Sequence, residues 1–165
     1  GAREVIHLDP VETQMVIDLI DDSYNANPTS MEAALDVLAI GRIINNTGTI
    51  AEGRRIVFLG DMKELGSQAV SMHGDLACLD VMETIDKIYC IGPLMRHLYE
   101  ALPLEKRGLW TETSAEMVTN IRRKLKSGDV VLVKGSLSMK LALVVDAIRK
   151  MSHPVSAGTK LQDKV

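Results

Sequence analysis

Aromatic residues, cysteines and long apolar runs are scarce in this sequence. Aromatic residues make up 3% of its 165 residues, so aliphatic side chains and the nine methionines must fill the core. Cys78 and Cys90 lack zinc-type spacing, which favours two buried, reduced thiols and a cytoplasmic protein. No apolar run reaches about 18 residues and no signal sequence opens the chain, so we expect neither a membrane span nor export.

Nucleotide-binding fingerprints and basic clusters are also missing. There is no G-x-x-x-x-G-K-[ST] loop, and no G-x-G-x-x-G at the first predicted strand–helix turn, which argues against a dinucleotide-binding oxidoreductase. A net charge of −3 without a basic run argues against a nucleic-acid partner. Because the chain opens with Gly1 and lacks a phosphate loop, we expect a fragment without the catalytic centre.

What is present is an alternation of strands and helices. Apolar runs predict strands at about 14–20, 54–59, 87–91, 108–110 and 129–133. Helical signals predict helices at about 29–45, 67–82, 93–102, 114–126 and 138–150. Their short connections favour crossover units, so the expected fold class is α/β, a Rossmann-like, doubly wound, mainly parallel sheet of five to six strands with helices on both faces.

The expected domain organisation is simple. A single domain at 14–150 follows an interdomain linker or edge strand at 1–13 and precedes a mobile, polar tail at 151–165. Within the domain, polar segments follow several strands, and the carboxyl ends of parallel strands meet at one edge. The sequence therefore predicts the functional site at that edge.

The first polar segment follows the strand at 14–20. Asp21 and Asp22 could accept hydrogen bonds from ribose hydroxyls, or one of them could cap the turn. Asn25 and Asn27 suit either an adenine edge or the loop's own backbone. Helix entry is indicated by Asn27 or a Thr29-x-x-Glu32 capping box, with Pro28 in the first turn.

The later polar segments bear a lysine, hydroxyls and an aspartate. Lys134 ends the strongest predicted strand beside Ser136 and Ser138, a combination that suits a substrate carboxylate, although a strand-end lysine can also be a solvated charge. Asp61 could orient a substrate amine or stabilise a rigid turn, and we favour the turn. His73 is expected to be a satisfied residue without a catalytic role.

Three stretches also carry a family resemblance. They are Asp-Asp-Ser-Tyr-Asn-Ala-Asn-Pro-x-Ser-Met at 21–31, Leu-Gly-Asp-Met-Lys-Glu-Leu-Gly at 59–66 with His73 beyond it, and Val-Leu-Val-Lys-Gly-Ser at 131–136. In this order they resemble the C-terminal domain of the D-alanyl-D-alanine-adding branch of the Mur ligase family. The resemblance spans about residues 16–148.

The resemblance implies an ATP-dependent amide ligase of peptidoglycan precursor synthesis. Its partners would be ATP, UDP-N-acetylmuramoyl tripeptide and D-alanyl-D-alanine, with ATP and Mg²⁺ held mainly by a central domain that the chain lacks. This domain would close over the nucleotide and position the dipeptide. Nucleotide contacts would come from Asp22 and Asn25, with Asp21 and Asn27, and substrate contacts from Lys134, Ser136, Ser138 and Asp61. No catalytic residue or metal ligand is expected in this chain.

Two alternatives belong to other classes. A phosphoacceptor receiver domain would use an acidic pair, a middle aspartate and a late lysine, which Asp21, Asp22, Asp61 and Lys134 loosely imitate. Against it, Asp61 follows the second strong predicted strand instead of the third, and the chain is too long. A generic Rossmann-like nucleotide-binding module is the other alternative.

Overall fold

The computed structural model describes residues 2–44 and 53–152. The strands are β1 Ala2–His7, β2 Val16–Asp22, β3 Arg55–Gly60, β4 Lys87–Ile91, β5 Arg107–Thr111 and β6 Val130–Lys134. The α-helices are α1 Pro28–Ile44, α2 Ala69–Gly74, α3 Met95–Ala101, α4 Ser114–Met117, α5 Ile121–Lys124 and α6 Ala142–Arg149. Short 3₁₀ segments are η2 Gly66–Gln68, η3 Asp75–Cys78, η4 Asp80–Thr84, η5 Leu104–Lys106 and η6 Leu137–Met139.

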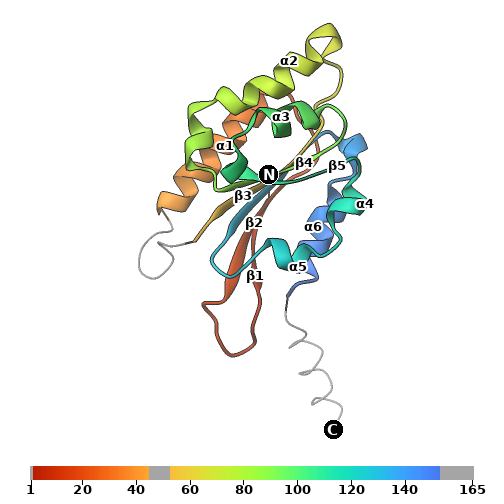
Figure 1. The fold of residues 1–165 in the computed structure, drawn as a ribbon. Coiled ribbons are helices and arrows are strands. Elements are labelled where there is room, and N and C mark those ends of the chain that lie inside the picture. Colours follow the sequence, from red (N-terminus) through yellow and green to blue (C-terminus); the bar gives the residue numbers. More distant parts are fainter. Residues whose placement is uncertain (1, 45–52, 153–165) are drawn as a thin grey trace.

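The six strands form one sheet in the order β1-β2-β6-β3-β4-β5. β1 pairs antiparallel with β2, and all other neighbours are parallel. Helices α1, α2 and α3 lie on one side of the sheet and α4, α5 and α6 on the other (Figure 1). The predicted α/β fold, with a mainly parallel sheet of five to six strands, is confirmed.

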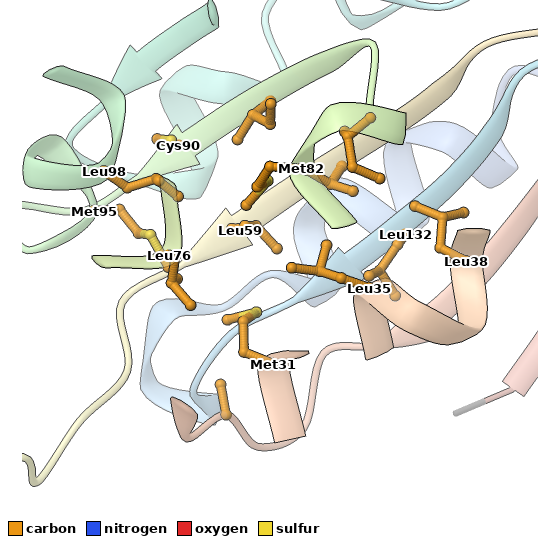
Figure 2. Close-up of a cluster of buried hydrophobic side chains, with 14 of the residues drawn as sticks. Met31, Leu35, Leu38, Leu59, Leu76, Met82, Cys90, Met95, Leu98 and Leu132 are labelled. Carbon is orange, nitrogen blue, oxygen red and sulfur yellow. The ribbon is translucent and has the colours of Figure 1, made fainter. Parts of the chain in front are cut away.

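Both faces of the central strands are buried, which explains their continuous apolar runs. Val57 and Leu59 pack in the cluster under α1, whereas Ile56 and Phe58 pack in the cluster on the opposite face. Figure 2 shows the α1 side of the sheet, where the α1 residues Met31, Leu35 and Leu38 lie near Leu59 and Leu132 of the sheet. Aromatic packing is limited: Phe58 and Tyr89 stack with their ring centroids 4.7 Å apart.

Three predicted helices are interrupted in the structure. The predicted helix at 67–82 is divided between η2, α2, η3 and η4, and the extended backbone of Leu79 separates η3 from η4. The helix at 114–126 is divided at Asn120, which has a left-handed φ of 59°. The last helix begins at Ala142 instead of Ser138, because Lys140 is also left-handed, with φ 57°. Apolar spacing alone did not reveal these backbone breaks.

Several sequence expectations concern the ends and the thiols. The 1–13 segment contains β1, the edge strand, whereas the tail from 153 onward lies outside the described residues. Both cysteines are free, but Cys78 is exposed, so the prediction of two buried thiols is wrong for it. Across the described ranges, no helix combines the length and apolar character needed to cross a bilayer.

Candidate functional site at the carboxyl edge of the sheet

The loops after the parallel strands gather at one edge of the sheet, as predicted. The register places Asp22, the last residue of β2, opposite Lys134, the last residue of β6. Gly60 at the end of β3 lies opposite Ile91 at the end of β4. A Cβ at Gly135 would lie only 2.9 Å from the Gly60 Cα, so a glycine lets the loops after β3 and β6 pack together.

Asp21 holds the turn that follows β2. Its Oδ1 accepts hydrogen bonds from the Ser23 backbone N–H at 3.1 Å and the Ser23 hydroxyl at 2.6 Å. Its other oxygen lies 3.6 Å from the Arg149 guanidinium. The turn-capping alternative for one of the two aspartates therefore applies to Asp21.

Asn27 caps helix α1. Its Oδ1 accepts a hydrogen bond from the Ser30 backbone N–H at 2.8 Å, and the Ser30 hydroxyl accepts one from the Asn27 backbone N–H at 3.1 Å. The reciprocal pair is therefore Asn27 with Ser30, and the prediction of a Thr29-x-x-Glu32 box is wrong. Because its oxygen is used in the cap, Asn27 is less available to a nucleotide than the sequence suggests.

Lys134 is a buried ion-pair partner, with only 3% of its surface exposed. Its Nζ donates to Asp22 Oδ2 at 2.9 Å and to the Asn25 backbone carbonyl at 2.8 Å. The parallel register brings Asp22 and Lys134 side by side. This geometry does not provide the accessible cation that we expected for a substrate carboxylate, because two acceptors of the chain already hold the ammonium.

A pocket of about 420 Å³ opens beside this ion pair. Its lining residues are Asp22, Asn25, Ser30, Ala33, Ala34, Val37 and Lys134. Among the described residues, the exposed Asn25 amide makes no hydrogen bond, and the second carboxylate oxygen of Asp22 has no bonded donor. The pocket thus combines an amide, a carboxylate oxygen and apolar side chains, a set that suits a flat heterocycle joined to a sugar.

Asp61 is fully buried and caps helix α3. Its carboxylate accepts hydrogen bonds from the backbone N–H groups of Met95 at 2.7 Å and Leu94 at 3.2 Å. A Cβ at Gly92, which has φ 112°, would lie 2.4 Å from this carboxylate. The expectation that Asp61 contacts substrate is therefore corrected to the turn role that we favoured. The same burial removes it as an accessible phosphoacceptor.

His73 and Ser136 bind the backbone of the loop that contains Asp61. His73 Nε2 accepts from the Met62 N–H at 2.9 Å, and its Nδ1 lies 2.6 Å from the Ala69 carbonyl, which assigns the proton to Nδ1. Burial lowers the pKa of the His73 imidazole, so the neutral ring is favoured. The Ser136 hydroxyl accepts from the Lys63 N–H at 3.0 Å, so it is structural instead of substrate-facing. The prediction that His73 is a satisfied residue agrees with these bonds, but the sequence did not indicate its partners.

Ser138 is exposed and lines a second hollow, of about 480 Å³. This hollow lies between the loops that follow β4, β5 and β6. Its lining residues are Pro93, Glu112, Thr113, Ser114, Ala115, Ser138, Met139, Lys140 and Leu143. Within the described ranges, no three His, Cys, Asp or Glu side chains gather as metal ligands.

Comparison with known proteins identifies one matching family and several similar proteins and structures. Residues 8–137 match the family described as "Mur ligase, glutamate ligase domain". The UDP-N-acetylmuramoyl-tripeptide--D-alanyl-D-alanine ligase of Rickettsia prowazekii is 30% identical over 128 residues, which cover 78% of this chain and 26% of that protein. Its counterpart in Buchnera aphidicola subsp. Baizongia pistaciae is also 30% identical, over 91% of this chain and 29% of that protein. The chain thus spans less than a third of either relative.

Solved structures give the same result. MurF from Acinetobacter baumannii matches with a TM-score of 0.65 and 29% identity, over 90% of this chain and 31% of that chain. MurF from Thermotoga maritima, a structure in complex with ADP, matches in fold with a TM-score of 0.62 at 23% identity, over 82% of this chain and 28% of that chain.

Proposed function

The chain belongs to the Mur ligase family, as a C-terminal domain of the D-alanyl-D-alanine-adding type, and from this premise we propose that it serves the ligation that its relatives' names describe. The whole enzyme transfers the γ-phosphoryl group of ATP to the terminal carboxylate of UDP-N-acetylmuramoyl tripeptide. The amine of D-alanyl-D-alanine attacks this acyl phosphate, forming the amide and releasing phosphate. We place the reaction in the cytoplasm.

The nucleotide lies against the pocket beside Lys134 in this proposal. The observation that carries it is the pair of bonds from Lys134 Nζ, which fix Asp22 and the Asn25 backbone at the pocket mouth. The second oxygen of Asp22 can accept from ribose hydroxyls, and the Asn25 amide can both donate to and accept from an adenine edge. ATP supplies the phosphoryl group, and Mg²⁺ is held mainly outside this domain. The ADP in the Thermotoga maritima relative supports a nucleotide near this fold.

The domain's catalytic contribution is positioning. An oriented attack within one complex replaces an encounter in solution, and such orientation is worth several kcal/mol of barrier. The buried bonds of Asp61, His73 and Ser136 keep the loops after β3, β4 and β6 in fixed positions, and fixed loops are what positioning requires. Asp21 and Asn27 act on the nucleotide side through the turn and the helix cap that they form.

The proposal is tested in the full-length enzyme that contains this domain. Incubation with ATP, Mg²⁺, the tripeptide nucleotide and D-alanyl-D-alanine should give the pentapeptide product by mass spectrometry and equimolar ADP. Replacing Asn25 with Ala should raise the KM for ATP several-fold and leave the KM for the dipeptide unchanged. The 165-residue chain alone should neither hydrolyse ATP nor form the amide. Absence of product from the wild-type enzyme would contradict the proposal.

A further inference from the structure

Arg149, the last residue of α6, lies among carboxylates from three elements. Its guanidinium is 2.5 Å from Glu4 of β1, 3.5 Å from Asp146 of α6 and 3.6 Å from Asp21 of β2. Of these three, Asp21 stands beside the turn that leads to the nucleotide pocket. We propose that Arg149 is a positioning residue for this pocket and acts on it through Asp21, an inference that rests on the proposed function.

Arg149 and the pocket lie on opposite faces of the sheet (Figure 1). Side chains alternate along β2, so Leu19 packs in the cluster that contains α6 residues and Ile20 in the cluster that contains α1 residues. By the same alternation, Asp21 faces Arg149, whereas Asp22 lines the pocket beside α1. The arginine therefore does not line this pocket, and its effect on binding must pass through the backbone of β2.

The path from Arg149 to the pocket consists of short, direct contacts. Arg149 contacts one oxygen of Asp21, and the other oxygen accepts from the N–H and the hydroxyl of Ser23. Ser23 is buried, and Asn25, two residues further on, lines the pocket and gives its carbonyl to Lys134. A carboxylate that is held by a guanidinium has fewer orientations, so the turn that it caps has fewer conformations.

The contacts of Arg149 should matter more for geometry than for stability. Its side chain is 43% exposed, and exposed ion pairs add little to folding because water and salt screen them. Loss of the guanidinium should therefore leave the enzyme folded. A turn with more conformations must be ordered when the nucleotide binds, and this ordering lowers the affinity.

The test measures nucleotide affinity and backbone protection in the full-length enzyme. With Arg149→Gln, the KM for ATP should rise about two- to fivefold, the range that one exposed ion pair supports, while kcat and the KM for the dipeptide stay constant. Hydrogen exchange of the segment 21–25, followed by mass spectrometry without nucleotide, should become faster. Arg149→Lys should restore part of both properties. Glu4→Gln removes another partner of the arginine and keeps Asp21, so it should change neither.

A double-mutant cycle then tests the path through Asp21. In an Asp21→Ala background, Arg149→Gln should raise the KM for ATP no further, because the path is already interrupted. An additive rise, an unchanged KM for ATP in Arg149→Gln, or an equal rise in Glu4→Gln would each overturn the inference. In these cases the wild-type enzyme still forms the pentapeptide product, so the proposed function stands.

Hydrogen exchange separates this inference from the proposed function. If the wild-type enzyme forms no product, the proposed function fails, and the exchange of the segment 21–25 still shows whether Arg149 holds the turn. Faster exchange in Arg149→Gln than in Glu4→Gln supports a positioning role. Equal exchange in the wild type and in Arg149→Gln overturns it.

Discussion

Two layers of polar side chains lie at the carboxyl edge of the sheet and differ in what they bind. The inner layer is buried and bonded to the chain itself; it consists of Asp61, His73, Lys134 and Ser136. The outer rim is exposed, and its side chains make no hydrogen bond to other described residues; it consists of Asn25, Glu112, Ser138 and Lys140. Lys134 and Lys140 show that the same charge can be bonded inside the chain or stand exposed at the rim, according to its depth.

The largest effect on stability is expected from the deepest carboxylate. Asp61→Ala leaves the N–H groups of Leu94 and Met95 without their acceptor inside the protein, which costs about 2 to 4 kcal/mol of unfolding free energy. Urea denaturation measures it. Asp36→Ala on the exposed side of α1 is the control and should stay within about 0.5 kcal/mol. Equal midpoints for both variants would place Asp61 with the outer rim.

A smaller loss is expected from the buried lysine. Lys134→Met removes the donor that Asp22 and the Asn25 carbonyl share, so the free energy of unfolding should fall by about 1 to 3 kcal/mol. The loss is limited because Asp22 can still reach water. Since the lysine fixes the pocket that we propose for the nucleotide, the KM for ATP of the full-length enzyme should rise more than its KM for the dipeptide. Lys150→Met provides the comparison. A dominant dipeptide defect would instead restore the role that the sequence suggested for Lys134.

Asn27 and Asn25 allow the same comparison, between a bonded and an unbonded side chain, within one loop. Asn27→Ala removes the cap of α1 and should cost about 1 kcal/mol, measured by calorimetry or urea. Asn25→Ala should leave stability within about 0.5 kcal/mol, because its amide has no partner among the described residues. If both variants lose the same stability, the Asn25 side chain is also structural.

The smallest effect on stability at neutral pH is expected from the titration of His73. This effect grows as the pH falls. Burial lowers the pKa of the folded-state imidazole, so the unfolded chain binds the proton more readily. The stability that the neutral ring provides is therefore complete above about pH 6.5 and is lost as pH falls toward the folded-state pKa. Urea midpoints at about pH 7.5 and 5.5 should separate in the wild type more than in His73→Gln. An equal difference between the two midpoints in both proteins would mean that other titrating groups dominate the pH dependence of stability.

The sequence predicted the strands better than the contacts of the site. Runs such as Ile56–Leu59 and Val130–Val133 are apolar because both faces of their strands are buried, and burial is visible in composition. The bond between Lys134 and Asp22 joins positions 112 residues apart, and only the strand register creates it. The same holds for Asp61, whose role depends on where α3 begins after β4. The local sequence pattern therefore located the site at the carboxyl edge of the sheet. It did not show which charged side chains at that edge face inward.

The position of β6 also affects how the chain can fold. β6 lies between β2 and β3, so these two early strands have no direct pairing until the segment near residue 130 joins them. Pairing across such long separations slows folding, since a long loop must close before any bond rewards it. During synthesis, the segment from β2 to β5 leaves the ribosome before β6 does, so the sheet at that stage has a gap in which the backbone edges of β2 and β3 are unpaired. The nascent chain is therefore most prone to aggregation, and most dependent on chaperones, just before β6 emerges.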